Sequence, residues 1–423
     1  MRISIPYYKG VMEADLDAGR VLGAVKARHQ EQRTEEQQRQ IVAEALREPI
    51  ESPRLRELAA DKQRVLVITS DHTRPMPSAI TLPLLLDEIR AGNPQAEIKI
   101  IVATGFHRAM TEAEMRQRFG DALFERETIL VHDSRDDAGL TRYGTLPSGG
   151  ELWLNSLVSW ADLLVSEGFI EPHFFAGYSG GRKSVLPGIS GQATVFYNHN
   201  ARFLADEHSR VGVLEENPIH RDMEYAAERA GLAFILNVCL NEQKQITYAV
   251  AGDRTAAHRK GCEFVRRSTG AKTRTADIVI TGNGGYPLDL NIYQSVKCMS
   301  GAEAFVRKDG VIIACCSCVD GHGSQGFYDL FKTHGSPRRV MGAILEKAPE
   351  DTMADQWQAQ VMARVMQKAT VILVTDQCDP ALIEDFGLLH ASDLQSALAL
   401  ADQRMGRESS VLLLPNGVEI IPL

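Results

Sequence analysis

The first half of the chain alternates short runs of apolar, β-branched residues with polar loops and helical patterns. The runs occupy residues 64–70 (RVLVITS), 97–105 (EIKIIVATG) and 161–168 (ADLLVSEG). Strands that alternate with helices usually pair in parallel, so this half is expected to form an α/β structure around a mainly parallel sheet. In such sheets ligands bind at the carboxyl ends of the strands.

Each run leads into a loop whose residues are able to bind a ligand. The loops are DHTR (residues 71–74), GFHR (residues 105–108) and EPHFFAGYSGGRK (residues 171–183). Because the carboxyl ends of parallel strands meet at one edge of a sheet, we expect the three loops to line one crevice. Beyond the second loop, Thr111 and Glu114 fit a capping box, which predicts the start of a helix.

The third loop belongs to a glycine-rich segment, HFFAGYSGGRKSVLPGISG, that begins at His173. It is not a P-loop, because Arg182 stands where that motif has the glycine before its lysine. Backbone N–H groups of such a loop, together with Arg182 and Lys183, are suited to a phosphate or a carboxylate. The alternative is a glycine-rich turn with two solvated cations. The density of glycines favours the anion site.

Histidines occupy three informative places among the 12 in the chain. His107 and His173 each follow a predicted strand, and His199 follows Lys183 after a short helical pattern. Histidine serves as a general base or as a metal ligand, and nothing local separates these roles. From spacing alone, functional histidines and ordinary structural ones remain equally open.

A second α/β series begins near residue 276 and runs through ADIVITG, GVIIACCS, ATVILVT and VLLLPNG. A chain of 423 residues exceeds what one core usually supports. We therefore expect two α/β domains with mainly parallel sheets, residues 1–270 and 271–423, with the active site in the cleft between them. The last residues are candidates to pack back on the first domain. The segment CCSC (residues 315–318) is spaced too closely for a zinc-binding pair and indicates buried residues at a strand end.

Charge and composition limit the partners and the compartment. The net charge is −9 and no long basic run is present, which argues against nucleic acid as the main partner. No apolar stretch is long enough to span a bilayer, and the first residues lack the apolar core of a signal peptide. Seven cysteines, an odd number, predict reduced thiols. We expect a cytoplasmic protein without a membrane partner.

Several motifs taken together resemble one known family. SDHTRPMPS, ATGFHR, EPHFFAGYSGGRKSVLPGISG, NHN and YPLDLNIYQSVK are similar to motifs of the lactate racemase superfamily, the nickel-pincer-nucleotide-dependent racemases and epimerases of 2-hydroxy acids. The similarity extends from the YKG segment near the N-terminus to the last predicted strands. The motifs are shared across the superfamily, so they do not single out lactate over malate, phenyllactate or a sugar acid.

The resemblance implies a cofactor and the residues that hold it. The cofactor is a pyridinium-3-thioamide-5-thiocarboxylic acid mononucleotide that carries nickel and is joined through a thioamide to the position of Lys183. His199 matches the protein ligand of the nickel. Maturation enzymes that make the cofactor are implied as partners. The other residues assigned to cofactor binding are Asp71, Gly177, Gly180, Gly181 and Arg182.

The same resemblance implies a reaction and a substrate site. His107 and His173 match two catalytic bases, one on each face of a small 2-hydroxy acid. One base takes the hydroxyl proton while hydride leaves C2 for the cofactor, and the reverse step on the other face inverts the carbon. Arg74 matches the arginine that binds the substrate carboxylate, with Asp71 as its support. The remaining substrate-binding candidates are Tyr293, Gln294, Lys297 and Trp357.

Two other functions are compatible with the motifs. One is a transferase or hydrolase that binds a nucleotide or a sugar phosphate with the glycine loop alone. The other is a non-catalytic homologue that carries the cofactor. The joint presence of three histidines, Lys183 and Arg74 favours the racemase or epimerase, because packing alone does not require this set.

Overall fold

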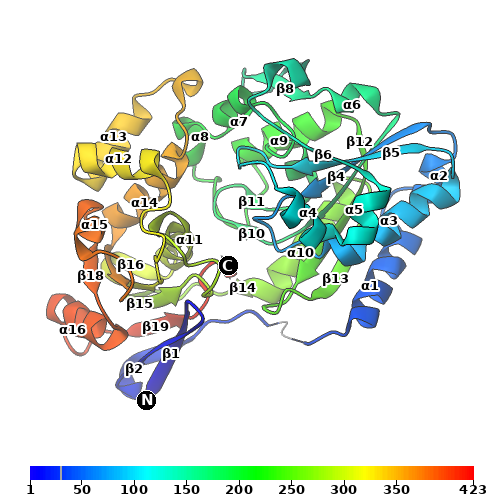
Figure 1. The fold of residues 1–423 in the computed structure, drawn as a ribbon. Coiled ribbons are helices and arrows are strands. Elements are labelled where there is room, and N and C mark those ends of the chain that lie inside the picture. The colour runs from blue at the N-terminus through cyan, green and yellow to red at the C-terminus, as the bar shows by residue number, and fades with distance from the viewer. Residues whose placement is uncertain (29–30) are drawn as a thin grey trace. The chain divides into compact units, whose positions relative to one another are not determined.

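The computed structural model describes residues 1–28 and 31–423, which divide into two compact units (Figure 1). Unit 1 comprises Met1–Arg28, His199–Gly212 and Thr269–Leu423, and unit 2 comprises the remaining described residues. The chain passes from unit 2 to unit 1 between Ser268 and Thr269, next to the boundary expected at residue 270. The first 28 residues and the short segment from His199 nevertheless belong to unit 1, which differs from the expected division.

The N-terminal arm belongs to unit 1 because its strands complete the structure there. The hairpin of β1 (Arg2–Tyr7) and β2 (Gly10–Asp15) places Ile3 and Ile5 in the apolar core of this unit. The next strand, β3 (Val21–Ala24), pairs in parallel with β19 (Val411–Leu414) at the edge of the sheet. Local patterns predict a hairpin but do not show which core it joins.

Unit 2 is built around a six-stranded sheet with the strand order β13-β12-β9-β4-β5-β6. Neighbouring strands are parallel except β12 and β13, which are antiparallel. The predicted runs form β4, β5 and β9, which are adjacent, so the mainly parallel sheet is confirmed. The strands are β4 (Arg64–Ser70), β5 (Glu97–Ala103), β6 (Thr128–Val131), β9 (Leu163–Phe169), β12 (Leu232–Leu240) and β13 (Ile246–Gly252).

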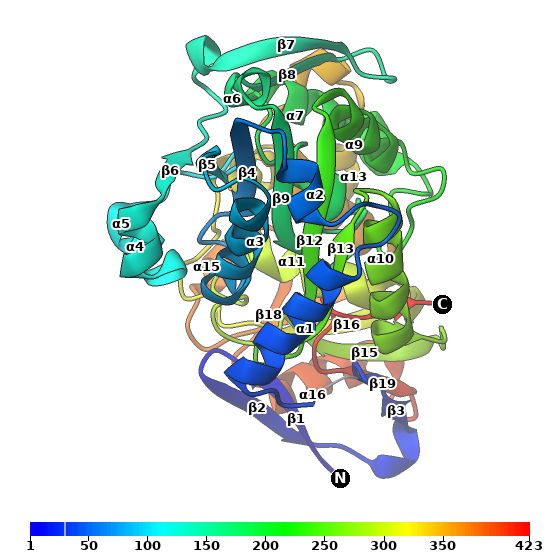
Figure 2. The same cartoon turned by 90° about the vertical axis from the view of Figure 1, so that its right-hand side faces the viewer.

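Three helices of unit 2 lie over one face of this sheet, where Figure 2 shows α1, α2 and α3 in front of the strands. Val65 and Val67 of β4 share a buried apolar cluster with Leu82 and Leu85 of α3. Burial of such side chains is the main stabilising term of an α/β layer. The helices are α1 (Glu35–Arg47), α2 (Leu55–Ala59), α3 (Ser78–Gly92), α4 (Glu112–Phe119), α5 (Asp121–Arg126), α6 (Leu157–Trp160), α7 (Gln192–Asn198), α9 (Pro218–Arg229) and α10 (Ala256–Thr269).

Short elements of unit 2 shape its loops. The capping box predicted at Thr111 and Glu114 is confirmed at the start of α4. The hairpin β7 (Leu140–Thr145)–β8 (Glu151–Asn155) precedes β9. The small hairpin β10 (Pro172–His173)–β11 (Gly177–Tyr178) and the 3₁₀ turn η3 (Gly181–Ser184) form the glycine loop after β9.

Unit 1 has its own six-stranded sheet, in the order β18-β17-β16-β15-β19-β3, with all neighbours parallel. Its further strands are β15 (Ala276–Gly282), β16 (Val306–Cys315), β17 (Thr370–Val374) and β18 (Leu389–Ala391). The last strand, β20 (Ile421–Pro422), pairs with β14 (Gly270–Ala271) inside this unit. The helices are α8 (Ala201–Ala205), α11 (Ile292–Glu303), α12 (Gln325–His334), α13 (Pro337–Leu345), α14 (Gln356–Lys368), α15 (Pro380–Asp385) and α16 (Leu394–Met405).

The cysteines of CCSC are buried and free at the end of β16, as predicted. None of the helices in the described part of the chain combines the length and the apolar composition needed to cross a bilayer.

Candidate active site

Three loops of unit 2 gather at one edge of its sheet. They follow β4, β5 and β9, which are adjacent and parallel. The Gly105 N–H donates to the Gly188 carbonyl oxygen (2.9 Å), and His107 Nδ1 lies 2.7 Å from Asp71 Oδ2. The expectation that these loops lie together is confirmed.

Asp71 and His107 form a hydrogen-bonded pair. The carboxylate is buried and also accepts hydrogen bonds from the Thr73 N–H (3.0 Å) and hydroxyl (2.6 Å). Burial by itself raises the pKa of Asp71, but the hydrogen bond and charge of His107, with the charge of Arg74 and the hydrogen bond of Thr73, lower it to about 2. The ionised carboxylate holds the His107 hydrogen on Nδ1, which leaves Nε2 as the nitrogen that accepts a proton. Asp71 was predicted to bind the cofactor, and the contact that the structure gives it is with the candidate base.

His173 is held differently from His107. It ends β10, and its Nδ1 accepts a hydrogen bond from the Ala176 N–H (3.2 Å). Its ring stacks on Phe174 and meets Phe175 edge to face, with ring centroids 5.0 and 4.5 Å apart. A neutral ring bonded in this way carries its hydrogen on Nε2. In their neutral forms the two candidate bases are therefore different tautomers, with Nε2 of His107 able to accept a proton and Nε2 of His173 carrying the hydrogen.

The glycines of the third loop are required by the protein itself. Gly177, Gly180 and Gly181 all have positive φ, and a Cβ on each would approach protein atoms to 2.3, 2.7 and 2.8 Å. The Gly181 N–H is already bonded to Asn237 Oδ1 (2.7 Å). These contacts build the loop, and they account for the glycines without a ligand.

Arg182 was predicted to help bind an anion, and the structure gives its side chain other partners. Its side chain is buried, with Nε donating to His220 Nδ1 (2.9 Å) and the Nη atoms bonding the carbonyls of Gly180 (3.3 Å) and Ala176 (2.8 Å). Nη1 also lies 3.0 Å from His258 Nε2. With these contacts the guanidinium holds the glycine loop against His220 and His258. Its hydrogen bonds go to protein groups, so the geometry does not support its predicted role in binding phosphate.

Lys183 lies next to this buried cation. Burial lowers the pKa of its amine well below the usual value, and the charges of Arg182 and Arg74 lower it further. Only Glu171 acts in the opposite direction among the causes of this shift. Among the described residues, Arg182 has imidazoles and carbonyls as partners and no carboxylate. The charges of Arg182 and Arg74 fit an anionic group such as a nucleotide, and the lowered pKa of Lys183 favours the uncharged amine that acylation requires.

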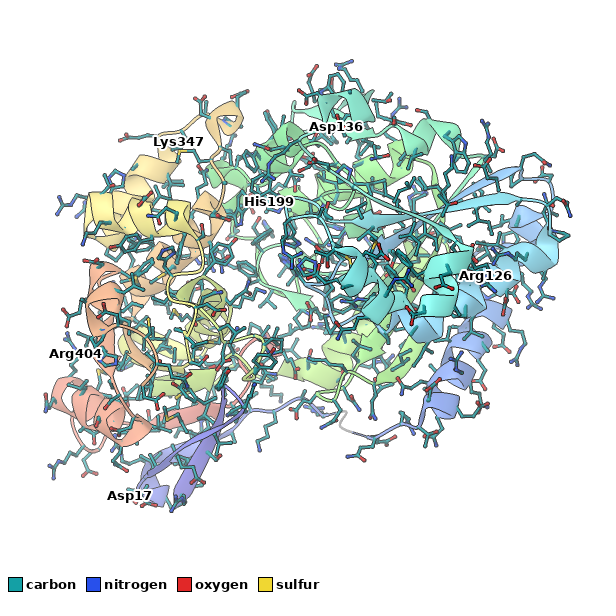
Figure 3. The ribbon with its side chains drawn as sticks, in the orientation of Figure 1. Asp17, Arg126, Asp136, His199, Lys347 and Arg404 are labelled. Atoms are coloured by element: carbon teal, nitrogen blue, oxygen red, sulfur yellow. The ribbon has the colours of Figure 1, made fainter. Side chains whose placement is uncertain are left out.

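The candidate residues of unit 1 lie at the starts of two helices. Tyr293 and Gln294 are in the first turn of α11 and Lys297 is one turn further on, while Trp357 is in the first turn of α14. The Trp357 Nε1–H donates to the Tyr293 hydroxyl (3.2 Å). His199, labelled in Figure 3, precedes α8, and its ring centroid is 5.4 Å from that of Trp357. The structure thus brings His199, Tyr293 and Trp357 together within this unit.

Arg118 braces the loop after β4, a role that no sequence motif indicates. This residue of α4 donates from Nη1 to the Met76 carbonyl (2.6 Å) and from Nη2 to the carbonyls of Asp71 (3.1 Å) and Arg74 (2.5 Å). One guanidinium therefore fixes the backbone that carries both Asp71 and Arg74. Contacts to distant carbonyls leave no side-chain motif, so no local pattern could have indicated this role.

The two ends of the same loop are fixed by Glu167 of β9. This buried carboxyl accepts hydrogen bonds from the hydroxyls of Thr69 (2.5 Å) and Ser78 (2.6 Å), and from Thr81. Thr69 precedes the loop and Ser78 begins α3 directly after it. Burial raises the pKa of Glu167 above its usual value, and the hydroxyls and the Arg118 charge oppose this. Glu167 and Arg118 together preorganise the loop.

Replacing Arg118 with methionine should weaken both the fold and the site. The loss of hydrogen bonds from a charged donor is expected to lower the free energy of unfolding by about 1.5–3 kcal/mol. The catalytic efficiency should fall by roughly tenfold or more, because the loop that carries Asp71 and Arg74 becomes less ordered. Thermal unfolding and steady-state kinetics measure the two effects.

The matched control is Arg116→Met on the same helix. Arg116 forms ion pairs with Glu112 and Asp121 that are exposed to solvent, and such pairs contribute little. Equal effects of the two substitutions would show that α4, and not the bracing of the loop, determines the loss.

Both halves of the chain match the domains of one known family. The model of the lactate racemase N-terminal domain matches residues 7–212, and that of the lactate racemase C-terminal domain matches residues 271–422. A lactate racemase from Thermoanaerobacterium thermosaccharolyticum is 49% identical, with 99% of this chain and 98% of the relative covered. A lactate racemase from Lactiplantibacillus plantarum is 42% identical, with 99% of each chain covered.

Solved structures agree with these relatives. The structure of the lactate racemase apoprotein from Thermoanaerobacterium thermosaccharolyticum matches with a TM-score of 0.97 and 48% identity, covering 100% of both chains. A protein from Thermotoga maritima shares the fold at a TM-score of 0.67 and 18% identity, with 91% of this chain and 97% of that one covered. On the strength of both domain matches and of relatives that span its length, the chain belongs to the lactate racemase family.

Proposed function

We propose that this protein is a lactate racemase, which inverts C2 of lactate with the help of a nickel-pincer nucleotide joined to Lys183. The observation that carries the proposal is the pairing of His107 with a buried carboxylate, Asp71, at the sheet edge from which the loop of Lys183 also leaves. Relatives named lactate racemases, 42% and 49% identical to the chain, support the choice of substrate.

Two residues of the family motifs, Lys183 and His199, are proposed to hold the cofactor. Lys183 is the point of attachment, and the lowered pKa of its amine favours the nucleophilic, uncharged form. His199 is the proposed protein ligand of nickel. When bound, the group supplies an acceptor and donor of hydride at C2. Enzymes that make and load the cofactor are the proposed partners.

The two histidines handle the hydroxyl proton of the substrate. Nε2 of His107 accepts the proton from one enantiomer, and the Asp71 carboxylate stabilises the imidazolium that results. His173 serves the other enantiomer. In the tautomer bonded to Ala176, Nε2 of His173 already carries the ring hydrogen. The ring can accept the substrate proton at Nε2 only after that hydrogen moves to Nδ1, which breaks the Ala176 N–H bond.

Arg74 is proposed to bind the substrate carboxylate. Its main chain is fixed by Arg118, and its charge acts on both Asp71 and Lys183. A planar guanidinium binds a carboxylate with two parallel hydrogen bonds, which holds C2 in one orientation. Tyr293, Gln294, Lys297 and Trp357 are proposed to complete the substrate site.

Arg74→Lys keeps the charge but removes the planar fork. We expect kcat/KM to fall by roughly tenfold to a hundredfold, since a charge-assisted hydrogen bond contributes about 1.5–3 kcal/mol. The cofactor content, measured as bound nickel per chain, should stay unchanged. A variant with near-normal kcat/KM would remove Arg74 from the substrate site.

The proposal as a whole is tested with protein produced together with the cofactor-making enzymes. Starting from either enantiomer of lactate, chiral chromatography should show approach to an equal mixture, and protein produced without those enzymes should be inactive. A loaded protein that leaves lactate unchanged but inverts another 2-hydroxy acid would overturn the substrate. A loaded protein that inverts none would overturn the activity.

A further inference from the structure

Asp355 has a backbone conformation that an aspartate rarely adopts. It stands directly before α14 with φ +65° and ψ −1°, in the left-handed region that favours glycine. It occupies the N-cap position of this helix, where an aspartate usually accepts a hydrogen bond from the first turn, but its side chain caps nothing. Neither the backbone nor the capping of α14 therefore explains the carboxylate.

The carboxylate instead bonds two hydroxyl groups from other helices. Oδ1 accepts the Tyr293 hydroxyl (3.0 Å) and Oδ2 accepts the Ser324 hydroxyl (2.5 Å). Tyr293 lies in the first turn of α11, and Ser324 is the N-cap of α12. One side chain thus joins the starts of three helices.

The hydrogen bond to Asp355 fixes the direction of the Tyr293 hydroxyl and leaves its oxygen as an acceptor. A phenol has one hydrogen, and when it is donated to Oδ1 the oxygen faces other groups as an acceptor. The Trp357 Nε1–H donates to this oxygen (3.2 Å), so the carboxylate acts on the indole through the phenol. The Trp357 ring in turn meets the His199 ring edge to face. A chain of contacts therefore leads from Asp355 to three residues of the candidate site.

We propose that Asp355 is a positioning residue for the substrate site, which fixes the direction of the Tyr293 hydroxyl and, through it, the indole of Trp357. Strained backbone is retained where the surrounding contacts require it, and such positions concentrate at functional sites. The role of Asp355 in the reaction rests on the proposed function, in which Tyr293 and Trp357 face the substrate. The hydrogen-bond chain itself does not depend on that function.

The first arm of the test uses the apoprotein and needs no turnover. The chain has three tryptophans, so ¹⁵N-labelled tryptophan gives three indole N–H signals, and Trp357→Phe identifies the one to follow. Asp355→Gly should shift this signal and leave the other two in place. Tyr293→Phe should shift the same signal. Because glycine adopts φ +65° without strain, the relief of strain opposes the loss of the two hydrogen bonds, and the unfolding temperature of Asp355→Gly should change little.

Two further variants serve as controls in the same spectra. Asp355→Asn tolerates the left-handed backbone and keeps one acceptor oxygen, so its shift should be smaller. Asp351→Gly removes an exposed acid four positions earlier and should shift none of the signals. An unmoved Trp357 signal in both Asp355 variants would overturn the proposal.

The second arm measures lactate turnover by the loaded enzyme in a double-mutant cycle. Asp355→Gly should lower kcat/KM by roughly tenfold to a hundredfold, the range expected for a lost charge-assisted hydrogen bond. In the Tyr293→Phe background the same substitution should lower it by less than about threefold, because the hydroxyl on which it acts is gone. Equal losses in both backgrounds would mean a general structural role and overturn the positioning role.

The two arms separate this proposal from the proposed function. If wild-type loaded protein does not turn over lactate, the proposed function fails, and the indole signals still decide whether Asp355 holds Tyr293 and Trp357. If turnover is normal and the signals do not respond, only the role of Asp355 fails.

Discussion

Lys183→Ala protein, produced together with the cofactor-making enzymes, should carry neither nickel nor any added mass on the peptide around residue 183. The amine is the proposed point of attachment, and the lowered pKa that burial and the charges of Arg182 and Arg74 give it favours the uncharged form that acylation requires. Without the amine no thioamide can form. Lactate racemisation should fall below detection, which is the largest effect expected of a single substitution in this chain.

Peptide mass spectrometry and metal analysis measure this result. Lys297→Ala is the matched control: it removes another lysine that is proposed to face the substrate, so the mass and the nickel should stay while turnover falls. An added mass that persists in Lys183→Ala protein would place the attachment elsewhere.

His107→Ala and His173→Ala should each lower the racemisation rate by roughly 10²- to 10⁴-fold, the usual contribution of a general acid–base group. Both enantiomers need their own base, so neither histidine replaces the other. Asp71→Asn should have a smaller effect of the same kind, because an amide no longer holds the Nδ1–H of His107 with a negative charge. Initial rates from each enantiomer, at equal nickel content, measure these losses.

His334→Ala, in the last turn of α12, is the control for the loss of a histidine as such. It should leave the rate unchanged. If His107→Ala and His173→Ala protein racemised lactate at rates close to those of this control, the assignment of the two bases would be wrong.

The strands and the loops after them could be predicted because their signals are local. RVLVITS and EIKIIVA are β-branched runs that match β4 and β5, and Thr111 with Glu114 caps α4 as its spacing indicates. Parallel pairing then brings the loops to one edge without any knowledge of side-chain contacts. The resemblance to the family motifs suggested the roles of the residues on these loops.

Contacts between distant segments could not be predicted from such signals. The burial of Arg182 depends on His220 and His258, and Arg118 and Asp355 act through a loop and helices far away in the sequence. The assignment of the N-terminal arm to unit 1 likewise depends on the pairing of β3 with β19. Each depends on the tertiary arrangement within one unit, and a sequence pattern records only the residue types.

Racemisation of lactate deuterated at C2, carried out in ordinary water and followed by NMR, tests the central claim most directly. In the proposed reaction His107 and His173 carry the hydroxyl proton, and the hydrogen on C2 never passes through a side chain that exchanges with water. The equilibrated mixture should therefore keep its deuterium at C2 after many turnovers. Loss of the label to solvent at the rate of racemisation would mean that the histidines remove the C2 hydrogen as a proton, and this result would contradict the account.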